Sequence, residues 1–84
     1  MTTAVEPRID QALGRLTPRE MDVLHLMSEG YSNLGIARTL FMAIKTVEAA
    51  CSQIFCKLGL APSVEMNRRV LASRILIDAR SAGR

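Results

Sequence analysis

Few side chains in this 84-residue sequence belong to the types that attack a substrate or ligate a metal. The two cysteines, Cys51 and Cys56, are separated by about 500° on a helix, so their thiols point about 140° apart. They cannot bridge within one helix, and with His25 far away they do not form a metal-ligand set. We therefore predict no metal, no cofactor and two free thiols, which suit a reducing cytoplasm.

Catalytic chemistry is not predicted for the other residues either. The sequence offers no nucleophile paired with a base and no glycine-rich loop that would cradle a phosphate. A chain of this length also leaves no room for a deep cleft between two domains. These features predict a binding protein, not an enzyme, and no small-molecule ligand is evident.

Residues 44–58 carry the pattern most typical of a binding surface. Val47, Cys51, Ile54 and Leu58 follow 4-3-4 spacing and form one apolar stripe of a helix. The opposite side, which we call the outward face, carries small and mostly polar groups, namely Lys45, Glu48, Ala49, Ser52 and Cys56. Because long side chains are nearly absent from it, this face could lie flush against a partner.

Start and stop signals place this helix in an all-α chain of four helices. The segment 16–20, LTPRE, predicts a capping box between Thr17 and Glu20, and the helix that follows should end near Gly30. Ser32 is the predicted cap of a short helix over 33–40, and a break of a few residues follows at 41–43. A short helix, a tight turn and a longer helix are typical of a helix-turn-helix.

A fourth helix, over about 64–79, shows two apolar stripes. One contains Leu71, Ala72, Ile75 and Ala79. The other is the predicted dimer interface, with heptad-like spacing and the residues Met66, Val70, Ser73, Arg74 and Ile77. One stripe can pack on the core while the other pairs with a second copy, although a helix buried on both sides within the monomer would use both.

Charge is unevenly divided along the chain. Residues 1–44 hold four cations and five anions, and residues 45–84 hold seven cations and three anions. A basic half favours a polyanionic partner such as nucleic acid. The longest apolar run is far shorter than the roughly 18 residues of a membrane span, and no secretory signal is visible at the start of the chain.

The combined string LTPRE, EG, SN, IA, KTVE and KLG, within residues 16–59, resembles the LuxR-type (GerE-like) helix-turn-helix domain of bacterial transcription regulators. The resemblance covers about residues 16–80. It implies a four-helix domain whose third helix enters the major groove of double-stranded DNA and whose fourth helix pairs two copies. We expect a stand-alone regulator in the cytoplasm, with the nucleoid, comprising an arm at 1–15 with one helical turn, the domain at 16–80 and a frayed tail at 81–84.

The sequence departs from the usual pattern of the family at several positions. Ala43 stands where a serine cap is common, Glu48 where a cation is common, and Ala50 where histidine is common. The third helix therefore has Lys45 and Lys57 against Glu48, and is nearly neutral. Because attraction to phosphates supplies much of protein–DNA affinity, we expect weak binding to DNA.

The position of each residue in this pattern implies its role on DNA. Glu48, Ala49 and Ser52 face the bases, where the carboxylate accepts from cytosine, the methyl group touches thymine and the hydroxyl serves either role. The predicted phosphate contacts are Asn33, Arg38, Lys45, Thr46 and Lys57. Simpler roles remain open for three of them: a local cap for Thr46, an ion pair with Glu48 for Arg38, and ordinary solvation for Lys57.

A protein partner is the alternative function. A degenerate helix-turn-helix could keep its fold and bind a protein through the outward face instead of reading DNA. Small or apolar groups favour this alternative at Leu34, Ile44, Ala49, Ala50 and Cys56.

Overall fold

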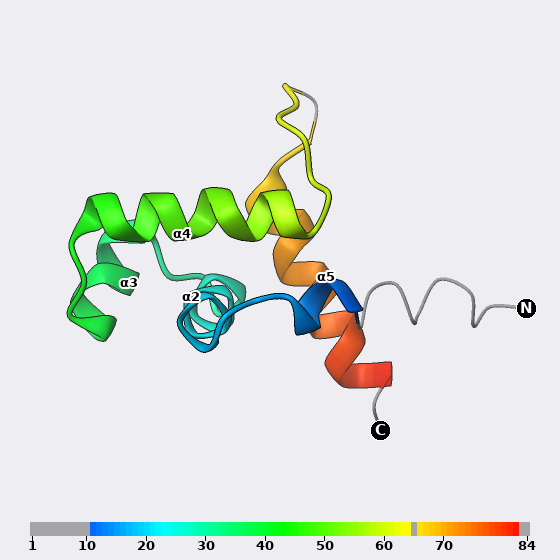
Figure 1. Ribbon diagram of the computed structural model, residues 1–84, viewed down its shortest axis with the longest axis horizontal. Coiled ribbons are helices and arrows are strands. Elements are labelled where there is room, and N and C mark those ends of the chain that lie inside the picture. Colours follow the sequence, from blue (N-terminus) through cyan, green and yellow to red (C-terminus); the bar gives the residue numbers. More distant parts are fainter. Residues whose placement is uncertain (1–10, 65, 83–84) are drawn as a thin grey trace, which may run out of the picture.

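The computed structural model describes residues 11–64 and 66–82, which form helices joined by short loops and contain no strand (Figure 1). A helical segment at 11–14 precedes α2 (Pro18–Ser28), α3 (Asn33–Leu40), α4 (Ile44–Lys57) and α5 (Arg68–Ala82). The predicted all-α fold is confirmed. Residues 1–10 of the predicted arm and 83–84 of the predicted tail lie outside the described residues.

The predicted caps start α2 and α3. Thr17 Oγ1 accepts from the Glu20 amide at 3.1 Å, and Glu20 Oε1 accepts from the Thr17 amide at 2.9 Å, which completes the capping box. Ser32 Oγ accepts from the Gly35 amide at 3.1 Å. Gly30 follows α2 with a φ of +96°, a conformation that glycine adopts without steric cost.

The predicted bounds of the fourth helix are wrong at both ends. Residues 64, 66 and 67 are not helical, and α5 begins at Arg68 because the Asn67 side chain caps it. Asn67 Oδ1 accepts from the Arg69 amide at 2.9 Å and from the Val70 amide at 3.3 Å. At the other end, α5 continues to Ala82, so Ser81 and Ala82 are helical and are not part of a frayed tail.

The core lies between α2, α4 and α5, with α3 packed against α4 and α2. Leu24, Ile36 and Ile54 are fully buried at its centre. The pattern of apolar residues did not predict two of its members, Phe55 and Leu76, which are 7% and 3% exposed. Ala50, predicted to face outward in the protein-partner alternative, packs against this core.

Candidate nucleic-acid interface

α3 and α4 form a helix-turn-helix. The chain direction changes by 111° between them, within the range of about 90–120° typical of this motif. Phe41 makes the turn in the left-handed conformation, with a φ of +56°, and its side chain is 96% exposed. The Met42 amide closes the turn by donating to the Ala37 carbonyl at 2.9 Å. This turn holds α4 across the top of the molecule, with one side free of other helices (Figure 1).

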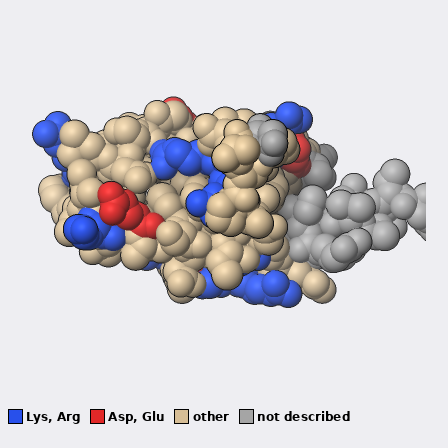
Figure 2. Space-filling view, turned by 90° about the horizontal axis from the view of Figure 1, so that it is seen from above, with Lys and Arg blue, Asp and Glu red and all other residues tan. Residues whose placement is uncertain are grey.

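The outward face of α4 is exposed, as predicted: Lys45, Glu48, Ala49, Ser52 and Cys56 all reach solvent. Figure 2 looks onto this side and shows a largely uncharged surface, with Lys and Arg side chains in small groups and a few acidic ones among them. Small side chains in the middle of the face let another molecule approach the helix closely.

The start of α4 is its most favourable place for a phosphate. Ala43 caps the helix with an extended backbone and no side-chain hydrogen bond, as its residue type predicts. The first amide groups of α4 therefore have no cap from Ala43, and the positive end of the helix dipole lies there. Lys45 and Thr46 are exposed beside it, in positions that suit contact with a phosphate.

Gln53 also belongs to the outward face, although the spacing of the apolar residues did not predict it. It is exposed and lies one helical turn from Ala49, so the two side chains are neighbours. The burial of Phe55 accounts for this position of Gln53. Because Phe55 is buried, the centre of the buried side of α4 lies nearer to Glu48 and Ser52, and the centre of the outward face lies nearer to Ala49 and Gln53. A glutamine there has the donor and acceptor that pair with the edge of adenine.

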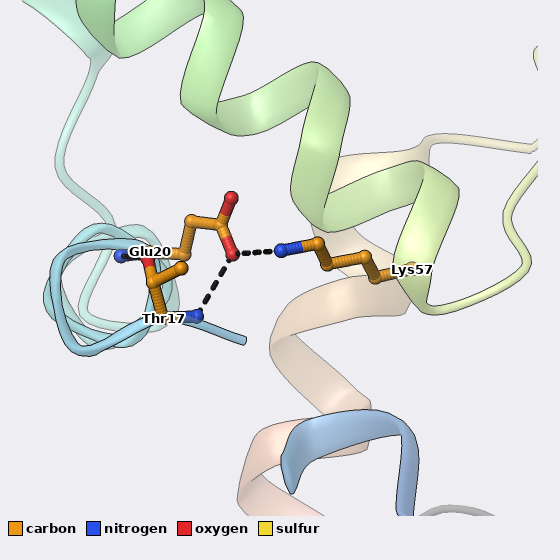
Figure 3. Close-up of polar contacts among 3 residues, drawn as sticks. All are labelled: Thr17, Glu20 and Lys57. Atoms are coloured by element: carbon orange, nitrogen blue, oxygen red, sulfur yellow. Dashed lines mark hydrogen bonds and ion pairs between the residues drawn. The ribbon is translucent and has the colours of Figure 1, made fainter. Parts of the chain in front are cut away.

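Lys57, a predicted phosphate contact, is held within the protein. Its Nζ lies 2.7 Å from Glu20 Oε1, and the two side chains are 27% and 11% exposed. Figure 3 shows the Glu20 carboxylate between the Lys57 ammonium and the backbone amide of Thr17. This ion pair fastens the end of α4 to the start of α2, so the ammonium of Lys57 already has an anionic partner.

The Glu20–Lys57 pair makes stability depend on pH. Burial raises the pKa of Glu20, but the hydrogen bonds from Lys57 and Thr17 outweigh it, so the net pKa lies below the ordinary value of 4.5. A carboxyl whose pKa is lowered by folding stabilises the protein above its unfolded pKa and loses that effect as the pH falls through the folded pKa. We expect the free energy of unfolding, measured by urea denaturation, to decrease as the pH is lowered below about 4.5. A Glu20→Gln variant that lost as much stability over the same range would contradict this assignment.

Asn33, which was also predicted to contact a phosphate, forms hydrogen bonds within the protein instead. It is part of a network centred on Arg69. Arg69 Nη1 donates to Asn33 Oδ1 and Nη2 donates to the Tyr31 carbonyl, each at 2.6 Å. The Cys51 thiol also donates to Asn33 Oδ1 at 3.6 Å, and burial raises the pKa of this thiol. Arg69 therefore joins α5 to the loop before α3, a role that sequence spacing did not indicate.

The same loop explains a glycine near the start of α3. A Cβ atom added to Gly35 would lie 3.1 Å from Cδ2 of the Tyr31 ring, closer than ordinary van der Waals contact. Gly35 therefore leaves room for the Tyr31 ring. The backbone carbonyl of Tyr31 accepts from Arg69.

The two stripes of α5 differ in exposure. Ala72 and Leu76 are buried against the core, and Leu71, Ile75 and Ala79 are half-buried. The predicted dimer interface faces solvent, with Arg74 exposed and Ser73 half-buried. Its three apolar residues are about half exposed, namely Val70 at 53% and Ile77 at 46% on α5, and Met66 at 52% in the loop before α5. A hollow of about 400 Å³ runs beside it, lined in part by Tyr31, Val70 and Ile77.

Other kinds of site find little support in the described residues. Cys51 is buried, Cys56 is exposed, and both are free thiols. No group of three potential metal ligands occurs in residues 11–64 and 66–82. In the same residues no single helix is long and apolar enough to cross a membrane, and α3 and α4 reach that length and composition only together, across their bend.

Comparison with known proteins agrees with this geometry. Residues 14–70 match the family model described as bacterial regulatory proteins, luxR family. An HTH-type transcriptional regulator of Mycobacterium bovis is 47% identical over 53 residues, which are 63% of this chain and 6% of that protein. The oxygen regulatory protein NreC of Staphylococcus aureus is 41% identical over 61 residues, 73% of this chain and 28% of that protein. No solved structure matches the chain significantly.

The chain thus spans only a small part of the relatives that it matches. The family model, in contrast, covers well over half of this chain, including all of α2, α3 and α4. The chain therefore belongs to the luxR family of bacterial regulatory proteins, which are DNA-binding regulators of transcription.

Proposed function

We propose that this protein reads a specific DNA sequence as a dimer, with α4 in the major groove and α5 at the dimer interface. The observation that carries the proposal is the exposed outward face of α4, set at 111° to α3. The base-facing residues are then Glu48, Ala49 and Ser52, with Gln53 added from its exposure beside Ala49. Such a regulator works in the cytoplasm, with the nucleoid.

The proposed phosphate contacts are those whose polar groups reach solvent. Arg38, Lys45 and Thr46 are exposed at the end of α3 and the start of α4. We leave Asn33 and Lys57 out of the proposed interface because the first accepts from Arg69 and the second is paired with Glu20.

Selection from genomic DNA fragments tests this function. The purified protein should enrich one sequence, and its affinity for the enriched duplex should fall as the salt concentration rises, because bound cations release counterions from DNA. Absence of duplex binding at micromolar protein and low salt would refute the proposal.

The dimer interface is tested by Val70→Asp. Val70 is 53% exposed, so a carboxylate there can stay hydrated and the monomer should fold, while pairing of two copies would bury it. We expect light scattering to give a dimer for the wild type and a folded monomer for the variant, with helical circular dichroism unchanged. A folded variant that remained dimeric would place the interface elsewhere.

A protein-binding face is the second candidate function. Exposed apolar side chains at both ends of α3 and the start of α4 favour it, with Leu34 45%, Phe41 96% and Ile44 40% exposed. Glu48→Lys separates the two candidates, because it should strengthen nonspecific DNA binding or alter the enriched sequence. If the face binds a protein, the same variant should instead lose a stoichiometric complex seen with the wild type.

A further inference from the structure

A hollow of about 340 Å³ lies where the end of α4 meets the loop to α5. Its wall includes Ser52 and Cys56 from the outward face of α4, residues 59–62 of the loop, and Arg68 at the start of α5. In Figure 1 this loop rises beyond α4 on the same side as the outward face. The hollow thus lies at one end of the proposed DNA-binding surface, where the loop borders it.

Arg68 is held in a fixed position at this wall. Its guanidinium carbon lies 4.7 Å from the centroid of the Phe55 ring, and Phe55 is a core residue with only 7% of its surface exposed. Stacking on a rigid ring orients the planar group while its N–H donors point sideways and stay available. Among residues 11–64 and 66–82, no hydrogen bond or ion pair engages this guanidinium.

The chemistry of the hollow suits an oxyanion. The guanidinium fork of Arg68, which lines the hollow, matches the geometry of phosphate oxygens. Among residues 11–64 and 66–82, no acidic side chain lines the hollow. A duplex that lies along the outward face must pass the loop, and the part of a duplex that meets such a wall is its sugar–phosphate backbone.

We propose that this hollow binds a phosphate group of the DNA backbone, with Arg68 as its cation. This inference rests on the proposed function and adds a residue outside α3 and α4 to the interface. It also accounts for a nearly neutral α4: a cation that this helix lacks is contributed by the start of α5.

Three variants of the intact protein test this site. Arg68→Gln removes the charge at similar length, Arg68→Lys keeps the charge, and Arg80→Gln removes a charge from an exposed position near the far end of α5. Affinity for the enriched duplex is measured between about 50 and 200 mM salt. We expect Arg68→Gln to weaken binding about threefold to tenfold at the lower salt and to reduce the salt slope by about 0.9 for each bound chain. Arg68→Lys and Arg80→Gln should keep the wild-type slope.

An unchanged slope in Arg68→Gln would overturn the site, as would an equal loss of slope in Arg80→Gln. If circular dichroism shows that Arg68→Gln is unfolded, Cys56→Glu replaces it, since this exposed position lines the hollow and a carboxylate there should weaken duplex binding similarly. Unchanged binding by Cys56→Glu would then refute the site.

A second measurement does not depend on duplex binding. Titration of the wild type with inorganic phosphate should shift the Nε–H signal of Arg68 in nuclear magnetic resonance spectra, and should leave that of Arg80 in place. Failure of the duplex assay together with this shift would contradict the proposed function and keep the anion site. Duplex binding that is unchanged by Arg68→Gln would support the proposed function and contradict the anion site.

Discussion

Ala49→Glu is expected to abolish duplex binding while the domain stays folded. Ala49 is exposed in the middle of the outward face of α4, where a base edge must approach the helix closely. A longer side chain would block that approach, and its carboxylate would repel phosphates and leave a buried charge unpaired. We expect affinity to fall by about 100-fold or more, equivalent to about 2.7 kcal/mol.

The fold should tolerate this change, because glutamate is a good helix former at an exposed position. Gln11→Glu is the matched control: it adds the same charge at an exposed site in the helical segment 11–14, which lies away from α4 in Figure 1. Fluorescence anisotropy with the enriched duplex measures both variants, and thermal melting verifies their folding. Equal binding by Ala49→Glu and the wild type would exclude α4 as the reading helix.

Lys57→Met should cause the largest loss of stability among the polar substitutions that we propose. It leaves the Glu20 carboxylate, whose side chain is 11% exposed, without the ammonium that now lies 2.7 Å away. Breaking a fully buried pair costs about 3–5 kcal/mol, and the partial exposure of Lys57 reduces this to about 2 kcal/mol. For a domain of this size, such a loss lowers the melting temperature by about 8–16 °C.

The pH dependence of this variant separates the ion pair from simple packing. Without Lys57, burial should raise the pKa of Glu20, so the protonated form becomes the one that folding favours. The destabilisation of Lys57→Met relative to the wild type should therefore shrink as the pH falls below about 4.5. The double variant Glu20→Gln/Lys57→Met should regain part of the lost stability at neutral pH. A deficit that did not change with pH would argue that the lysine acts through its methylene chain alone.

Local signals predicted most of the fold. The Thr17 and Ser32 caps and the glycines after α2 and α4 act within a few residues of their own position, so they can be recognised along the chain. The start of α5 was misplaced because Pro62 and Ser63 also make an acceptable helix start, and the Asn67 cap that the protein uses leaves a similar local signature.

The candidate site was predictable only in part. The outward face of α4 follows from helical spacing, but the burial of Phe55 turns that face toward Gln53, and this depends on the position of the other helices. Asn33 and Lys57 are polar residues that the sequence pattern predicts to be exposed to solvent. Their partners, Arg69 and Glu20, are 36 and 37 residues away, and no local pattern announces such pairs.

The long separation between Arg69 and its partners has a consequence for synthesis of the chain on the ribosome. Arg69 is made 36 residues after Asn33. At translation rates of about 5–20 residues per second, the loop before α3 waits about 2–7 s for the guanidinium that holds it. During that interval the Tyr31 carbonyl and the Asn33 side chain are hydrated and α5 is not docked. The helix-turn-helix thus reaches its final shape only after the start of α5 has been translated.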